Sequence, residues 1–291
     1  MPGPVRITEP MGPGLARVWV VDEVLFETRT EFQHVLIGRT AQGVSLFCDD
    51  ERQSTEASQL VYHEALMVPA MLLAERVRRV LVIGSSEGVV CELALAAGAE
   101  LVDHVDIDEK TVRACAEHLP YGYTAAELAR AETGEGPVRM HYRDGWEFLA
   151  GAARAGDTYD VIVIDLPDEN DDPEAQHNRL YGKDFLSRCA GLLAEGGVVT
   201  CQAGCPTLWR NETLAASWRR FHEVFPTVLY YGSDEHEWAF VTGRADRVDE
   251  PGATVAARLG ATGLQASTMD AETLRGGAVA PYAVRVLDSP V

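Results

Sequence analysis

Hydrophobic and polar residues alternate in short steps over the first part of the chain. The alternation is clearest at residues 15–21 and 34–38, and Gly43 interrupts it soon afterwards. A period of two residues is typical of strands with one buried face, and glycine-containing breaks between such runs indicate hairpins. We therefore predict a small N-terminal antiparallel β-domain over residues 1–60.

The pattern then changes to helices that alternate with short apolar strands. Because such alternation produces a mostly parallel sheet, we predict an α/β protein whose Rossmann-like catalytic domain covers residues 61–291. Within residues 190–200, a helix is predicted to close at a glycine before the chain returns as a strand. The other predicted strands are residues 79–84, 102–106, 138–142 and 159–165, and the predicted helices are residues 62–68, 89–97, 109–118, 146–153 and 183–193.

The first strand of this region ends in a turn of small residues, Gly84-Ser85-Ser86-Glu87, that opens into a helix. The second strand ends in Asp106, about 20 residues further on, as in βαβ units that bind nucleosides. Such a turn lets the backbone approach a ligand, and the acid can hold two ribose hydroxyls. The strict three-glycine fingerprint is absent, so further residues must support this interpretation.

Two more strands end in acidic residues. Asp144 and Gly145 follow the third strand, where the carboxylate could contact the exocyclic amine of an adenine. The fourth strand delivers Asp165 and Asp168, three residues apart. Because ligands collect at the carboxyl ends of parallel strands, these residues should share one crevice with Gly84.

The formal net charge of −20 argues against a nucleic-acid partner, since phosphate binding requires clustered basic side chains. The charge is compatible with steering a cationic substrate such as a polyamine into an acidic cleft. Ordinary solubility of an acidic protein explains it as well.

The six cysteines show no paired spacing of a structural zinc site, so we predict free thiols and no metal. The N-terminal residues lack the basic and apolar regions of a signal peptide. No apolar run approaches the length of a membrane span, which indicates a cytoplasmic protein without a membrane partner.

With these motifs, the chain resembles the spermidine synthases, or polyamine aminopropyltransferases. The resemblance extends from residues 24–34 through Tyr62-His63-Glu64 to residues 225–228 and Tyr282. It implies a transferase of polyamine biosynthesis with a class I S-adenosylmethionine-binding fold. Members bind decarboxylated S-adenosylmethionine, and an amine attacks the carbon next to its sulfonium. The family also suggests a homo-oligomer, a dimer or tetramer.

The resemblance assigns roles to individual residues. Asp165 and Asp168 match the family's Asp-x-x-Asp motif, with Asp165 as the general base. The alternative is that both are turn-forming aspartates after a strand. The remaining matched residues would bind the donor: Asp106 at the ribose, Asp144 with Gly145 at the adenine, Gln33 at the thioether end, and His63 and Glu87 near the amino tail.

The chain departs from the family in the glycine-rich turn, where Ser85, Ser86 and Glu87 replace two glycines and an aspartate. Two hydroxyls there could hydrogen-bond a carboxylate that the decarboxylated donor lacks. S-adenosylmethionine itself is therefore an alternative donor. The enzyme would then be a 3-amino-3-carboxypropyltransferase or a methyltransferase that acts on a specialised metabolite.

The acceptor side departs as well. Ser58 and Gln59 replace acidic residues of the family, so we expect an altered acceptor pocket. Glu235, His236 and Glu237 could contact a new acceptor or form a solvated surface turn. The acid-rich residues 165–172 could be a gating loop or an ordinary solvated loop.

A third class of function is a nucleoside-binding protein without catalysis. Retention of Asp106, Asp144, Asp165 and Asp168 together argues against it. The sequence describes the acceptor only as an amine or another nucleophile. It also leaves open the group transferred, the pathway and the oligomeric state.

Overall fold

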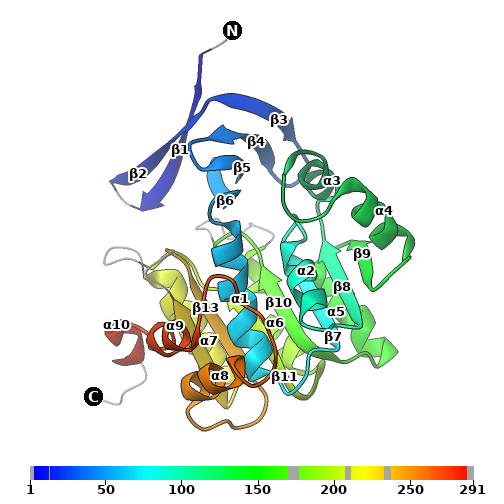
Figure 1. Cartoon of the computed structure of the whole chain (residues 1–291), viewed down its shortest axis with the longest axis vertical. Helices are drawn as coiled ribbons and strands as arrows, with labels where there is room; N and C mark the ends of the chain where they lie inside the picture. Colours follow the sequence, from blue (N-terminus) through cyan, green and yellow to red (C-terminus); the bar gives the residue numbers. More distant parts are fainter. Residues whose placement is uncertain (1–2, 13, 170–176, 207–210, 233–236, 287–291) are drawn as a thin grey trace.

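A small β-rich part lies at one end of an α/β body, as Figure 1 shows. The computed structural model describes residues 3–12, 14–169, 177–206, 211–232 and 237–286. An α/β fold with a mostly parallel central sheet and a small antiparallel N-terminal part was predicted from the sequence, and the structure confirms it.

The N-terminal part contains two antiparallel sheets, one of two strands and one of four. Alternate residues are buried in the two-stranded sheet, whereas the two central strands of the four-stranded sheet are buried at consecutive positions. Ile7, Trp19 and Phe47 belong to a small core between the two sheets. The predicted hairpins are therefore present. The strands are β1 (Val5–Gly12) and β2 (Leu15–Val21) in the first sheet, and β3 (Glu23–Arg29), β4 (His34–Thr40), β5 (Gly43–Cys48) and β6 (Glu51–Thr55) in the second.

The body is built on a seven-stranded sheet with the order β12-β13-β11-β10-β7-β8-β9. The strands from β7 to β11 run parallel, whereas β13 is antiparallel to both β11 and β12. The bounds are β7 (Arg79–Gly84), β8 (Leu101–Asp106), β9 (Val138–Tyr142), β10 (Tyr159–Asp165), β11 (Leu193–Gln202), β12 (Thr227–Gly232) and β13 (Ala239–Arg244).

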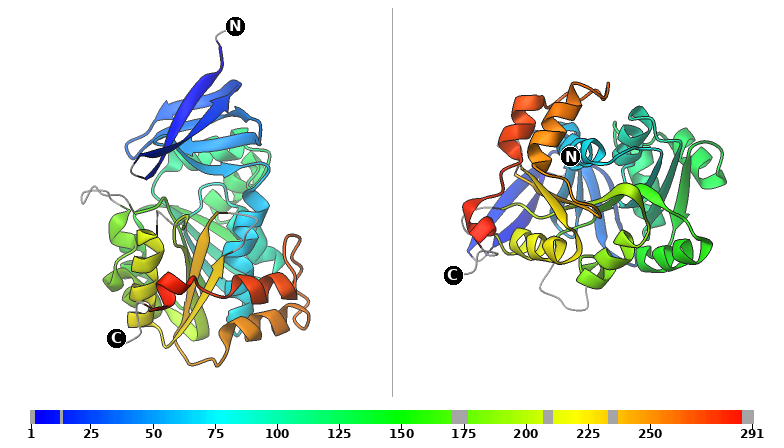
Figure 2. Two further views of the ribbon diagram at one scale, coloured as in Figure 1. Left: turned by 90° about the vertical axis from the view of Figure 1, so that its left-hand side faces the viewer. Right: turned by 90° about the horizontal axis from the view of Figure 1, so that it is seen from below.

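Helices cover both faces of this sheet, as the views in Figure 2 show. Val80 and Val82 of β7 belong to the core under α1, α2, α4, α8 and α9, whereas Leu81 and Ile83 belong to the core under α5, α6, α7 and α10. The helices are α1 (Gln59–Leu73), α2 (Val89–Ala96), α3 (Glu109–His118), α4 (Ala125–Thr133), α5 (Gly145–Ala155), α6 (Lys183–Ala190), α7 (Glu212–Val224), α8 (Pro251–Leu259), α9 (Ala271–Gly277) and α10 (Tyr282–Arg285), with a 3₁₀ turn η1 (Asn178–Leu180).

The return from α6 into β11 follows the prediction in that Gly191 caps the helix, but the helix is shorter than the predicted residues 183–193. The helix ends at Ala190, and β11 already begins at Leu193, so Gly196 and Gly197 lie inside the strand. The register between β10 and β11 shifts there, and Gly196 takes a positive φ of 70°. Gly196 and Gly197 therefore form an irregularity in the strand instead of ending the helix.

All six cysteines are buried free thiols. In the part of the chain that the structure describes, none of the helices combines the length and apolar character that a membrane crossing requires.

Candidate active site

The carboxyl ends of β7, β8 and β10 bring the predicted site residues together. Gly84 pairs with Asp165 in the sheet, and the amide of Ser85 donates to the Asp165 carbonyl at 2.9 Å. Asp106 ends β8, and its carbonyl accepts from Arg143 at 2.9 Å, directly before Asp144. The strand ends that were predicted to share one site therefore adjoin at this edge of the sheet.

Gly84 is required at the turn by its backbone and by its neighbours. Its φ is +84°, and a Cβ atom would lie 2.0 Å from the carbonyl oxygen of Asp165. Ser85 follows with a φ of +60°, a conformation that residues other than glycine rarely adopt. Strained backbone of this kind collects at ligand-binding sites, where the surrounding structure maintains it.

His104 supports this turn from below, a role that the sequence did not reveal. Its Nε2 lies 2.7 Å from the Gly84 carbonyl oxygen, and its Nδ1 lies 2.9 Å from the hydroxyl of Tyr123. Burial lowers the pKa of His104 to about 4. The imidazole is therefore neutral, with Nε2 donating to Gly84 and Nδ1 accepting from Tyr123.

Asp106 is buried at the predicted ribose position. Its Oδ1 accepts from the amide of Asp108 at 2.8 Å, and its Oδ2 accepts from the Ser86 hydroxyl at 2.7 Å. Burial raises the pKa of Asp106 to about 6, although both hydrogen bonds oppose the shift. Each carboxylate oxygen keeps a further lone pair for a ribose hydroxyl. The hydroxyl of Ser86 is thus engaged with this acid.

Gln33 lies in the turn between β3 and β4, at the edge of the site. Its side-chain nitrogen donates to Asp108 at 3.1 Å and to Thr111 at 3.2 Å, both at the start of α3. Asp108 also caps α3 by accepting from the Thr111 amide. These bonds attach the N-terminal sheet to the start of α3, which follows Asp106 in the chain.

Asp144 caps α5 by accepting from the amide of Glu147 at 3.1 Å, and it also forms an ion pair with Arg179. The sequence did not predict Arg179 as its partner. Gly145 begins α5, where a Cβ atom would lie 2.9 Å from the side chain of Ile83. Glycine therefore allows the start of α5 to approach Ile83 of β7 closely.

Asp165 is half-buried and accepts a hydrogen bond of 2.6 Å from the hydroxyl of Tyr62 in α1. Burial raises the pKa of Asp165, the nearby Glu87 acts in the same direction, and His63 and the Tyr62 bond oppose it. The sequence identified the segment that contains Tyr62 but gave this residue no role. The two residues are 103 positions apart in the chain.

His63 and Glu87 lie beside this carboxylate. The Nδ1 of His63 is 2.7 Å from the carbonyl oxygen of Gln59, and its Nε2 is 3.9 Å from a carboxylate oxygen of Glu87. Both side chains are buried. Because the Gln59 carbonyl fixes Nδ1 as the donor, Nε2 faces Glu87.

Asp168, three residues further on, is more buried than Asp165. Three side chains hold its backbone segment. The Nε2 of His177 lies 2.9 Å from the Asp168 carbonyl oxygen, and the Tyr181 hydroxyl and the Gln202 amide each donate to the Leu166 carbonyl at 2.9 Å. The beginning of the predicted gating loop is therefore anchored. The remainder of that prediction, residues 170–172, lies outside the described residues.

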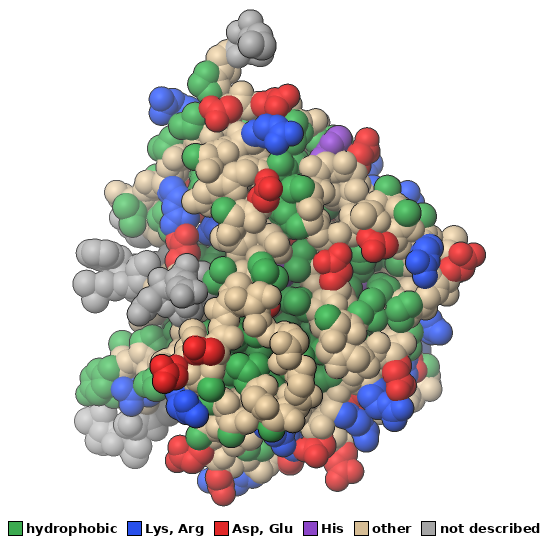
Figure 3. Space-filling model, viewed as in Figure 1, with side chains coloured by type: hydrophobic (Ala, Val, Ile, Leu, Met, Phe, Trp, Pro, Cys, Tyr) green, Lys and Arg blue, Asp and Glu red, His purple; other side chains and the backbone are tan. Residues whose placement is uncertain are grey.

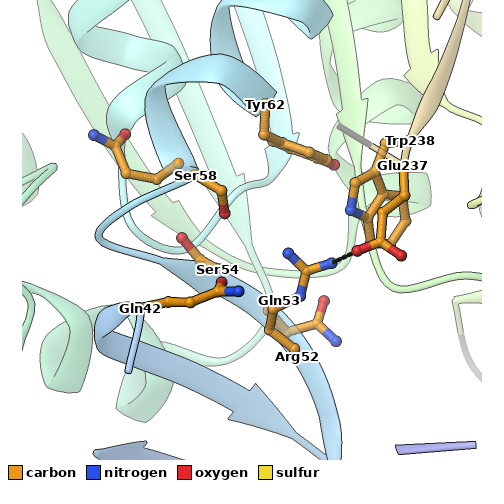
Figure 4. Close-up of a pocket in the computed structure, with 9 residues that line it drawn as sticks. Gln42, Arg52, Gln53, Ser54, Ser58, Tyr62, Glu237 and Trp238 are labelled. Atoms are coloured by element: carbon orange, nitrogen blue, oxygen red, sulfur yellow. Dashed lines mark hydrogen bonds and ion pairs between the residues drawn. The ribbon is translucent and has the colours of Figure 1, made fainter. Parts of the chain in front are cut away.

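A cavity of about 170 Å³ opens next to Tyr62 (Figure 4). Three residues named from the sequence as changes on the acceptor side, Ser58, Gln59 and Glu237, line it; Glu235 and His236 lie outside the described residues. The sequence gave no reason to expect the others. The full lining is Gln42, Arg52, Gln53, Ser54, Ser58, Gln59, Tyr62, Glu237 and Trp238.

This site can bind a nucleoside along one sheet edge and present the half-buried Asp165 carboxylate to a second, smaller molecule. Among the residues that the structure describes, no group of three or more His, Cys, Asp or Glu side chains could hold a metal ion. Fold and site together define a Rossmann-like nucleoside-binding protein with an adjoining acceptor-sized pocket.

Comparison with known proteins gives the family. The model of the spermine/spermidine synthase domain matches residues 59–233, more than half of the chain. Polyamine aminopropyltransferase 1 of Hyperthermus butylicus is 32% identical over 207 residues, which cover 70% of this chain and 68% of the relative. The polyamine aminopropyltransferase of Aeropyrum pernix is 30% identical over 244 residues, which cover 81% and 73% of the two chains. The chain belongs to the spermine/spermidine synthase family, and the resemblance seen in the sequence is confirmed.

Solved structures agree on the fold. A spermidine synthase in complex with the transition-state analogue AdoDATO superposes with a TM-score of 0.80 at 19% identity, covering 97% of this chain and 94% of the other. Spermidine synthase from Thermotoga maritima gives 0.77 at 18% identity, covering 97% and 93%.

Proposed function

We propose that this protein is an aminopropyltransferase that uses decarboxylated S-adenosylmethionine and an amine acceptor. Family membership supports the reaction class. The observation that carries the proposal is the position of Asp165. Its half-buried carboxylate lies at the sheet edge proposed to bind the nucleoside and bonds to Tyr62, which lines the cavity.

The reaction is a direct displacement. The lone pair of the amine nitrogen attacks the methylene carbon attached to the sulfonium sulfur, the carbon–nitrogen bond forms, and the carbon–sulfur bond breaks. The electron pair of that bond goes to sulfur, so neutral methylthioadenosine leaves. Holding the two reactants in line can supply several kcal/mol of the barrier reduction.

Asp165 would accept the proton that the amine loses. A general base works best when its pKa lies near the operating pH, and burial raises the pKa of Asp165 in that direction. The hydroxyl of Tyr62 fixes the orientation of the carboxylate. Asp168 would orient the acceptor from the same loop.

The donor residues keep their predicted roles in this proposal. Asp106 would hold the ribose, Asp144 and Gly145 the adenine, and Gln33 the thioether end. Asp144 can contact the adenine amine only through an oxygen that Arg179 does not cover.

The amino tail of the donor would lie near His63 and Glu87. Glu87 is close enough to Asp165 to raise the pKa of that carboxyl. A donor carboxylate would add a third negative charge, which favours the decarboxylated donor. The buried Ser85 hydroxyl beside Asp165 is the feature that favours intact S-adenosylmethionine, and with it carboxypropyl or methyl transfer.

Calorimetric titration of the purified protein with both donors tests the proposal. We expect the decarboxylated donor to bind at least tenfold more tightly than S-adenosylmethionine. Tighter binding of intact S-adenosylmethionine would contradict aminopropyl transfer and assign donor-carboxylate recognition to Ser85.

Two further predictions from the sequence belong to this proposal: a homo-oligomer and a cytoplasmic location. Light scattering of the purified protein measures the first, and fractionation of the producing cell tests the second.

A further inference from the structure

The cavity beside Tyr62 is mostly neutral at its wall. Of the residues that line it, Arg52 and Glu237 carry a charge at neutral pH, and the others are amides, hydroxyls and the indole of Trp238. Arg52 belongs to β6 in the N-terminal sheet, whereas Glu237 directly precedes Trp238 and β13 in the body. In Figure 4 the Arg52 guanidinium points toward Glu237, on the side of the cavity where Tyr62 and Trp238 lie.

The carboxylate of Glu237 already accepts hydrogen bonds from two arginine side chains. Its Oε1 accepts from Arg17 at 2.9 Å and from Arg52 at 3.1 Å, and its Oε2 forms a second bond with Arg17. Two guanidinium groups therefore share this carboxylate. Glu9 lies 3.6 Å from Arg17 and accepts from the indole of Trp19, so it does not face the cavity.

The guanidinium of Arg52 belongs to the cavity wall, where its Nη2 donates to Glu237. The side chain of Arg52 is only 7% exposed, and its Nε atom is buried with no hydrogen-bond partner among the described residues. A guanidinium group offers five N–H donors in a planar fork that matches a carboxylate. A buried donor without a partner is unfavourable, so this arrangement fits a ligand that brings an acceptor oxygen.

The guanidinium group of Arg52 also disfavours a diamine as the acceptor. If one amine of a diamine reached Asp165, its second ammonium would lie in the cavity with Arg52 and Glu237, whose carboxylate is already bonded to two arginines. Like charges placed together without solvent repel each other strongly. The acids that the family carries at residues 58 and 59 are a serine and a glutamine here.

We propose that the acceptor is an amino acid: its amine faces Tyr62 and Asp165, and its carboxylate binds Arg52. This inference rests on the proposed function, because it names the acceptor of the same transfer. Gln59 supports it from the wall, since its Oε1 is buried without a hydrogen-bond partner among the described residues and can accept from the substrate's ammonium group.

The test compares acceptors of matched length, 4-aminobutyrate with 1,4-diaminobutane and 5-aminopentanoate with 1,5-diaminopentane. Release of methylthioadenosine from the decarboxylated donor is the readout. We expect kcat/KM to favour the amino acids at least tenfold. Arg52→Gln should lower kcat/KM for the amino acids about 10- to 100-fold, the usual effect of one charge-assisted contact, without lowering it for the diamines. A preference for diamines, or an equal loss for both classes, would overturn the inference.

Arg39→Gln is the matched control, because Arg39 is another arginine of the N-terminal sheet that pairs with Glu23 and does not line the cavity. The acceptor preference should be unchanged in this variant, and melting curves should show that both variants fold. Where Arg52→Gln does not fold, Gln59→Glu replaces it. A new carboxylate in the wall should shift the preference at least tenfold toward diamines, and an unchanged preference would contradict the inference.

Calorimetry of acceptor binding separates this inference from the proposed function. Arg52-dependent binding of 4-aminobutyrate without any methylthioadenosine release would contradict aminopropyl transfer and support the acceptor assignment. Turnover confined to diamines would support aminopropyl transfer and contradict the acceptor assignment. If Arg52→Gln weakened binding of intact S-adenosylmethionine and left amino acid binding unchanged, Arg52 would belong to the donor site, and the inference would be wrong.

Discussion

Asp165 depends on Tyr62 for its orientation and its proton affinity. The hydroxyl of Tyr62 donates to the carboxylate at 2.6 Å, and this bond opposes the rise in the pKa of Asp165 that burial causes. Residues as far apart in the chain as these meet only after folding. The reactivity of the predicted base is therefore a property of two elements, α1 and β10.

Tyr62→Phe tests this pairing. The phenyl ring keeps the contacts with Trp238 and Phe240, at 5.5 and 5.2 Å between ring centroids, so the fold should persist. We expect kcat to fall about 10- to 100-fold, as for the loss of one hydrogen bond to a charged group. The pKa of Asp165 should also rise, so the acidic limb of the kcat/KM profile should move to higher pH. An unchanged rate and profile would contradict the role of Tyr62.

Asp106 predicts a pH dependence of nucleoside binding. Burial raises the pKa of Asp106 to about 6, and only the ionised carboxylate accepts two ribose hydroxyls. Affinity for methylthioadenosine, measured by calorimetry between pH 5 and 8, should therefore fall as the pH drops below 6. Ser86→Ala removes a bond that lowers this pKa, so the midpoint should shift to higher pH. A flat profile in the wild type would contradict the ribose role.

The same group affects stability with a defined sign. The pKa of Asp106 is higher in the folded state, about 6, than the ordinary 3.8, so the folded state binds more protons between these values. Its contribution to the free energy of unfolding should therefore decrease as the pH rises through this interval. Denaturant titrations of the wild type and Asp106→Asn should show the decrease in the wild type only.

Among the elements, the turn after β7 has the strictest backbone requirement. His104, from β8, donates to the carbonyl of Gly84, and Gly84 itself lies against Asp165 at the end of β10. Three neighbouring strands thus fix the turn that would approach the donor. The βαβ unit of β7, α2 and β8 positions the turn, and the hydrogen bond from the buried His104 imidazole restrains it.

Gly84→Ala should disrupt this element. The new Cβ would lie 2.0 Å from a carbonyl oxygen, in a backbone conformation with φ at +84°. We expect a loss of about 2 kcal/mol or more in the free energy of unfolding, together with weakened nucleoside binding. Gly98→Ala is a matched control, since Gly98 has a φ of +96° but no atom within 4 Å of the added Cβ. Equal losses in the two variants would contradict a specific clash at Gly84.

The sequence predicted the elements better than their contacts. Local periodicity located α2 and α3 within a residue, because their apolar positions and capping residues lie within the segments themselves. It misplaced the start of β11, because Gly196 marks an irregular strand pairing that depends on β10. The strand ends of the site followed from parallel topology, whereas Arg179 and His104 gained roles only through side chains from other elements.

At the scale of the whole molecule, the N-terminal sheet completes the site. Val35 and Leu46 pack with Cys115 of α3 in one core cluster, and Gln33 hydrogen-bonds to the start of the same helix. Arg52 reaches Glu237 across 185 residues of sequence, so the acceptor-side cavity is formed by both parts of the chain. Sequence periodicity could predict the two parts, but not the cavity between them.

Charge at this scale does not identify the substrate. The chain has a net charge of −20, yet on the face shown in Figure 3 acidic side chains lie among arginines and lysines instead of forming one patch. Under the proposed function, the few charges in the cavity wall would therefore select the acceptor, because exposed charges are screened by salt within about 10 Å.

The most direct test of the central claim is methylthioadenosine release from decarboxylated S-adenosylmethionine, with an amine acceptor, by the wild type and by Asp165→Asn. The wild type should turn over. The variant should lose about 10²- to 10⁴-fold in kcat, the usual contribution of a general base, while it keeps its affinity for the donor. Release by the variant at the wild-type rate, or its absence in the wild type with both amino acids and diamines, would contradict aminopropyl transfer assisted by Asp165.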